Sequence, residues 1–278
     1  MNASERVTAA RQILAVQALE LRKRFLGKRA IPVYMLALIP LVLFGARFVA
    51  AQVLQWNVGA LLAHDRVIYA VLYRTLVLRF VVYFGCVAVF VPLFRGDILD
   101  RSLHYYFLAP MKRQTLTAAK YLSGLLASLV LFNFVTLGTW NLMYLTLGPS
   151  VLAEQLRSGQ GWLELGAYLL VTSLACVGYG AVFLAAGVFV KNPIVPAVVI
   201  LGWESINALL PPVLKKVSVI HYLESLCPVS IPPDSGIAIL ADPASPWVAI
   251  PGIVLLAGLL VALAAWRVGR LEILYGVE

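Results

Sequence analysis

The chain has 278 residues, of which 62% are hydrophobic and only 13% are charged. A soluble domain carries about 25% charged residues, so this composition excludes an ordinary water-soluble globular protein. The net charge of +9 comes from lysines and arginines gathered between apolar runs, which indicates membrane topology and argues against a nucleic-acid-binding surface.

Several apolar runs reach the roughly 20 residues that a bilayer-spanning helix requires. The sequence therefore predicts an all-α membrane protein, with a cytoplasmic lead over 1–30 and a single six-span domain over 31–278. We expect the six transmembrane helices at about 31–51, 75–94, 116–147, 162–190, 194–210 and 247–266.

The lead carries apolar residues on one helical face, at Leu14, Ala18, Leu21 and Phe25, beside a basic cluster over 22–29. This pattern predicts an amphipathic helix in the membrane interface that binds anionic lipid headgroups. The alternative is a basic topology anchor with no further role. The apolar run that follows is too long for a signal peptide, so we expect a retained first span.

A charged segment, Arg95 to Gly124, separates the second and third spans. Asp97 and Asp100 open it, and the basic pair Lys112 and Arg113 follows an aromatic stretch. We expect the part over 95–115 to form a cytoplasmic helix at the membrane surface that another protein binds.

The segment over 211–246 contains seven prolines and two apolar pieces, at 217–227 and 237–241. Neither piece reaches the ~20 residues needed to cross a bilayer. The pattern predicts an external re-entrant helical hairpin between spans 5 and 6, buried in protein or facing water.

Basic residues test this topology. With both termini inside, 15 of the 22 lysines and arginines fall on the inner side. The asymmetry favours a multi-pass protein of the cytoplasmic membrane with cytoplasmic N- and C-termini.

The sequence lacks the usual motifs of catalysis. It contains no phosphate-binding G-x-x-x-x-G-K-[ST], no H-E-x-x-H and no G-x-S-x-G. The three histidines have no metal-ligand spacing, and the three cysteines are scattered. We therefore expect no enzyme activity, no metal and no cofactor in this chain.

One acidic residue, Glu204, falls within the predicted fifth span, with Asn207 one turn further on. A carboxylate at that depth is costly and indicates a functional site by default. Two interpretations remain open. Glu204 either lines a translocation path or forms a buried ion pair with Arg79 of the second span that fixes helix packing.

The segment Arg95 to Gly124 resembles the corresponding segment in transmembrane subunits of type-2 ABC exporters. The resemblance rests on two acidic residues, Ser-Leu, a further leucine, a proline, an arginine three residues on and a lysine entering the third span. These residues are Asp97, Asp100, Ser102, Leu103, Leu108, Pro110, Arg113 and Lys120. The expected order of spans resembles that family over nearly the whole chain.

The resemblance implies that the segment over 95–115 is a coupling helix seated in a separate ATP-binding subunit. The contact residues it implies are Asp97, Asp100, Leu103, Phe107, Pro110 and Arg113. It also implies a second permease subunit, identical or related, and export driven by ATP hydrolysis in the partner. The alternatives are a gradient-driven secondary transporter or channel of six spans, and an intramembrane enzyme. We assign no substrate.

Overall fold

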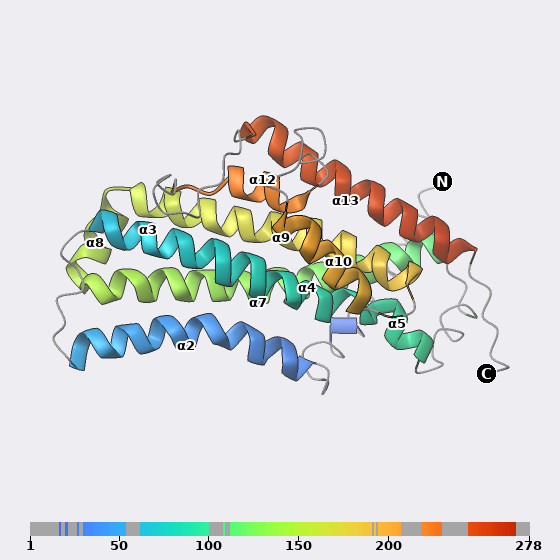
Figure 1. The fold of residues 1–278 in the computed structure, drawn as a ribbon, viewed down its shortest axis with the longest axis horizontal. Helices are drawn as coiled ribbons and strands as arrows, with labels where there is room; N and C mark the ends of the chain where they lie inside the picture. Colours follow the sequence, from blue (N-terminus) through green and yellow to red (C-terminus); the bar gives the residue numbers. More distant parts are fainter. Residues whose placement is uncertain are drawn as a thin grey trace, which may run out of the picture.

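The computed structural model describes residues 17, 20, 21, 27, 30–53, 62–99, 108, 112–190, 192, 194–206, 218–229 and 244–270. Within these residues the chain is helical and contains no strand (Figure 1). The helices are α2 (Ile31–Val53), α3 (Leu62–Leu72), η2 (Tyr73–Val82), α4 (Tyr83–Phe90), α5 (Pro92–Leu99), α7 (Arg113–Leu147), α8 (Pro149–Arg157), α9 (Gln160–Phe189), α10 (Ile194–Ser205), α12 (Val219–Ser225) and α13 (Pro246–Gly269).

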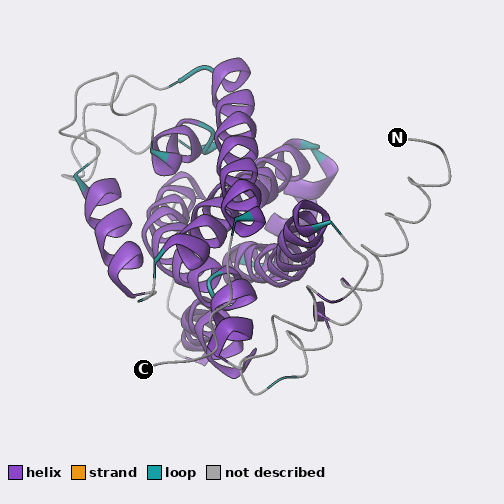
Figure 2. Cartoon of the chain, turned by 90° about the vertical axis from the view of Figure 1, so that its right-hand side faces the viewer, coloured by secondary structure: helices purple, strands orange, loops and turns teal. Residues whose placement is uncertain are grey.

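Five helices are long and apolar enough to cross a membrane, which confirms the prediction of a multi-pass membrane protein. They are α2, the continuous helix His64–Leu99 that contains most of α3 together with η2, α4 and α5, and then α7, α9 and α13. In Figure 1 α2, the second long helix, α7 and α9 lie roughly parallel and α13 is inclined to them, and Figure 2 views the bundle from one end. Each of these five helices is thus longer than the hydrocarbon core is thick.

Helix α9 lies at the centre of this bundle. It packs against α7, α13, α4, α5 and α12. In its most apolar stretch 67% of the residues are buried, against 22% in α2 and in α13. Glycines on α9 permit this close packing: a Cβ on Gly180 would lie 2.5 Å from the Phe90 ring.

Ion pairs connect the helices at one end of the bundle, which we call the Glu164 end. Arg47 on α2 donates to Asp65 at 2.6 Å, and Arg66 pairs with Glu164 at 2.8 Å. The Tyr144 hydroxyl also donates to Glu164, at 3.0 Å. Among the described residues, the second long helix begins at Leu62 and not near residue 75 as predicted, and these ion pairs neutralise the charges at its start.

A short helix, α8, connects α7 to α9 at the Glu164 end. The residues between the predicted third and fourth spans are therefore largely helical, from Pro149 to Arg157. Gly159 follows it with φ of 78°, the left-handed conformation that glycine adopts without steric cost. This glycine allows the chain to reverse direction into α9.

The opposite end of the bundle, which we call the Lys120 end, gathers the start of α7 and the ends of two other long helices. Lys120 contacts Asp97 near the end of α5, and Arg113 contacts Gly269, the last residue of α13. Lys120 also contacts Glu20, eleven residues before α2 begins. The N-terminal side of α2 and the C-terminal end of α13 therefore lie at the same end of the bundle (Figure 1).

The predicted fifth span, 194–210, is described only as far as residue 206, and it is helical from Ile194 to Ser205. Helix α10 has 12 residues, which at 1.5 Å per residue is ~18 Å and too short to cross a ~30 Å hydrocarbon core. Helix α12 follows with seven residues and packs on α9 and α13. The second short apolar piece, over 237–241, lies outside the described residues, so the re-entrant hairpin stays a prediction.

Candidate functional site

Four of the nine predicted site residues lie in the described part of the chain: Asp97, Arg113, Arg79 and Glu204. The other five fall outside the described residues, and their roles stay predictions. They are Asp100, Leu103, Phe107, Pro110 and Asn207. The four described residues belong to two separate sites, one at the Lys120 end and one around α12.

The first site is a buried charge cluster around Lys120, near the start of α7. The lysine side chain is fully buried. Its ammonium donates to Glu20 Oε1 at 2.8 Å, to the Leu93 carbonyl at 2.8 Å, and to the Asp97 carboxylate. An ammonium group has three donors, and these three acceptors can use all of them. The cluster joins the lead, α5 and α7 through one nitrogen atom.

The stability of the Lys120 cluster depends on the charges of its members. Two carboxylates, Glu20 and Asp97, face one ammonium, and the Phe94 ring centroid lies 5.4 Å from the nitrogen. A buried charge without a partner costs several kcal/mol, of order 3–5 when one member of a pair is removed. Loss of the lysine would remove the ammonium that both buried carboxylates contact.

This cluster gives Asp97 a partner within the chain. The resemblance implied that Asp97 contacts an ATP-binding subunit, but its side chain is buried and faces Lys120. Arg113 is also engaged within the chain, because its Nη1 donates to the Gly269 carbonyl at 3.2 Å. The two residues hold the base of the 95–115 segment in place. The sequence indicates Lys120 only as the lysine that enters the third span.

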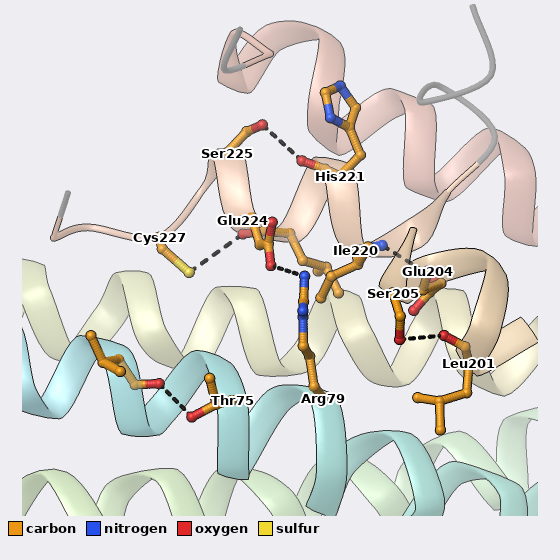
Figure 3. Close-up of polar contacts among 12 residues, drawn as sticks. Thr75, Arg79, Leu201, Glu204, Ser205, Ile220, His221, Glu224, Ser225 and Cys227 are labelled. Atoms are coloured by element: carbon orange, nitrogen blue, oxygen red, sulfur yellow. Dashed lines mark hydrogen bonds and ion pairs between the residues drawn. The ribbon is translucent and has the colours of Figure 1, made fainter. Parts of the chain in front are cut away.

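The second site surrounds α12 (Figure 3). Arg79 on η2 pairs with Glu224 at 2.7 Å, and both side chains are about one-third exposed. Arg74, one π-helical turn earlier, donates to the Val229 carbonyl at 2.7 Å. The ion pair proposed between Arg79 and Glu204 is therefore wrong, because the arginine has a different carboxylate as its partner.

Glu204 lies at the end of α10 and is 6% exposed. Its carboxylate accepts a hydrogen bond from the Tyr179 hydroxyl at 2.5 Å and one from the Ile220 N–H at 3.4 Å. Ile220 belongs to the first turn of α12, whose N–H groups have no partner inside the helix. The carboxylate therefore links α10, α9 and α12.

We expect Glu204→Leu to destabilise the protein and Glu204→Gln to have a smaller effect. Leucine would leave the buried Tyr179 hydroxyl without its acceptor, a loss of about 1–3 kcal/mol, whereas the glutamine carbonyl can still accept. Thermal unfolding of the purified variants in detergent measures the difference. Equal midpoints for both variants would contradict a structural role for this carboxylate.

Among the described residues, no three His, Cys, Asp or Glu side chains come together in a way that could hold a metal ion. Comparison of the chain with protein-family models, curated proteins and solved structures found no match. Any functional conclusion therefore rests on the residues and their geometry. In chemical terms, the two sites offer buried ion pairs and hydrogen bonds that connect helices.

Proposed function

We propose that this chain is the membrane-spanning subunit of a transporter powered by ATP hydrolysis in a separate protein, resembling the type-2 ABC exporters. The observation that carries the proposal is the position of the 95–115 segment. It connects the two longest helices of the described chain, His64–Leu99 and Arg113–Leu147. The absence of a phosphate-binding motif from the sequence means that the energy would come from a partner.

The geometry at the Lys120 end supports a mechanical role for that segment. Each flanking helix is about 50 Å long, against a hydrocarbon core of ~30 Å, so each would tilt in the membrane or extend beyond it. Lys120 connects the end of one helix to the start of the other. A force applied to the segment would therefore reach both helices together, as coupling to a partner ATPase requires.

Purification of the tagged protein from its native host tests the proposal. We expect a nucleotide-binding protein to copurify with the wild-type chain. Leu103→Arg, or charge reversal at Asp100, should abolish this association without affecting membrane insertion. Asp97 is unsuitable for the test because its carboxylate is part of the buried Lys120 cluster.

A matched control places the same charge outside the predicted contact. Gln160 is exposed at the start of α9, at the Glu164 end of the bundle, so Gln160→Arg should leave the association unchanged. Failure of any ATPase to copurify with the intact wild-type protein would count against the proposal. Transport energised by an ion gradient alone would favour the secondary-transporter alternative.

A further inference from the structure

The second long helix departs from α-helical geometry in its middle. Over the ten residues Tyr73–Val82 it forms a π-helix, in which backbone hydrogen bonds run between residues five apart. Such segments are rare, usually limited to a single turn, and frequent at functional sites. The sequence YRTLVLRFVV contains no proline or glycine that would force this geometry.

The wider turn changes which side chains share a face. Arg74 and Arg79 are five residues apart. In an α-helix of 3.6 residues per turn they would lie about 140° apart around the axis. In a π-helix, residues five apart lie one turn above the other on the same face. Both arginines do reach the same neighbouring element: Arg79 binds Glu224 of α12, and Arg74 binds the Val229 carbonyl just beyond it.

Two buried tyrosines hold the π segment at its ends. The Tyr73 hydroxyl lies 2.8 Å from Thr172 Oγ1 and donates to the Tyr168 carbonyl on α9. The Tyr83 hydroxyl, immediately after the segment, donates to the Ala197 carbonyl on α10 at 2.6 Å. These bonds fix the helix to different neighbours on the two sides of the wide turns.

Helix α12 is fitted against two glycines on its apolar side. A Cβ on Gly178 of α9 would lie 2.8 Å from Val219, and one on Gly252 of α13 would lie 3.0 Å from the Tyr222 ring. Gly178 is in the middle third of α9, so α12 reaches about halfway along the bundle. The arginines hold its C-terminal part, and Cys227 lies there, with Sγ 3.5 Å from the Leu223 carbonyl (Figure 3).

We propose that the π-helical segment Tyr73–Val82 holds α12 in place, because its helical register presents Arg74 and Arg79 on one face. A return of this segment to α-helix turns one arginine away from α12 and releases the C-terminal part of α12 together with Cys227. The proposal concerns α12 alone and holds whether or not the chain works with an ATPase.

Two single-residue deletions distinguish the effect of helical register from the effect of a general disruption of the helix. Each removes an exposed residue from the π segment, Thr75 or Phe80, and so favours an α-helix there. Deletion of Thr75 places the arginines four apart, which in an α-helix is about 40° and still one face. Deletion of Phe80 leaves them five apart, and in an α-helix they diverge by about 140°.

Cys227 is a built-in reporter of the position of α12. Burial raises the pKa of its thiol to about 11, partly offset by Arg74, so the seated thiol reacts slowly near neutral pH. The other two cysteines, Cys86 and Cys176, are fully buried in the bundle. The rate of Cys227 labelling is measured on purified protein in lipid nanodiscs, which leave both faces of the membrane open to solvent. The reagent is a membrane-impermeant maleimide, and mass spectrometry follows the reaction.

We expect the Thr75 deletion to label Cys227 at the wild-type rate and the Phe80 deletion to label it at least about tenfold faster, because α12 opens more often when a charge-assisted bond is lost. Equal rates in the two deletions, whether slow or fast, would overturn the proposal. So would the reverse order.

A second set of variants serves if either deletion fails to fold. Arg79→Glu and Glu224→Arg should each accelerate labelling of Cys227. The double variant, which reverses the ion pair on two partly exposed positions, should restore the slow rate. Unchanged labelling in both single variants would show that the arginine does not hold α12, and the proposal would be wrong.

Discussion

Replacing Lys120 with methionine should be among the most destabilising single changes in this protein, with a loss of about 3–5 kcal/mol. Methionine fills a similar volume but leaves the carboxylates of Glu20 and Asp97 without the ammonium that they share. We expect a much lower midpoint of thermal unfolding in detergent, followed by the fluorescence of the native tryptophans.

The same helix provides a control for the Lys120 variant. Lys112 immediately precedes α7 and is exposed, so Lys112→Met should change the free energy of unfolding by less than about 0.5 kcal/mol. Adding Glu20→Gln and Asp97→Asn to Lys120→Met should recover part of the loss, because the buried charges are then removed. Equal midpoints for the two methionine variants would refute the buried cluster.

Gly187→Ala should separate α9 from the second long helix and cost about 1–3 kcal/mol. A Cβ at this position would lie 2.8 Å from the Val91 carbonyl oxygen and 3.1 Å from its Cα. These are backbone atoms, so no side-chain rotation relieves the clash and the helices themselves must move apart. Thermal unfolding followed by circular dichroism measures the loss.

Gly166 is the matched position on the same helix, because no atom lies within 4 Å of a Cβ placed there. Alanine forms helix better than glycine by about 1 kcal/mol, so Gly166→Ala should leave stability unchanged or raise it. The contrast isolates helix contact from helix propensity. If both alanine variants were equally stable, the close approach of α9 to Val91 would be disproved.

The long helices were the most predictable part of the fold. Runs of about 20 or more apolar residues have few alternatives in water or lipid, so the five long spans follow from composition and length. The limits of the helices were harder to predict. Charged residues such as Asp65 and Arg66 indicate a loop by themselves, but they occur within a helix because Arg47 and Glu164 neutralise them.

The partners of the buried charges could not be predicted from one sequence. The two carboxylates on Lys120 lie 100 and 23 residues away along the chain, at distances that no helical period links. Arg79 had more than one candidate carboxylate, and the prediction selected Glu204 where the structure has Glu224. An intramembrane charge signals that a partner exists without saying which one.

The π-helix was equally inaccessible to sequence analysis. Prolines and glycines usually mark an irregular helix, and Tyr73–Val82 has neither. The geometry is held by contacts that come from other elements, such as the bonds of Tyr73 and Tyr83 to α9 and α10. Tertiary structure, which a local pattern does not contain, supports it.

The short lengths of α10 and α12 have a mechanical consequence. The five long helices are stiff, so each transmits a displacement from one end of the bundle to the other. Among the described residues, α10 and α12 are two short helices of 12 and seven residues, and the Glu204 carboxylate accepts a hydrogen bond from α12. A displacement of α10 can therefore reach α12 through Glu204, while the long helices around them keep their length.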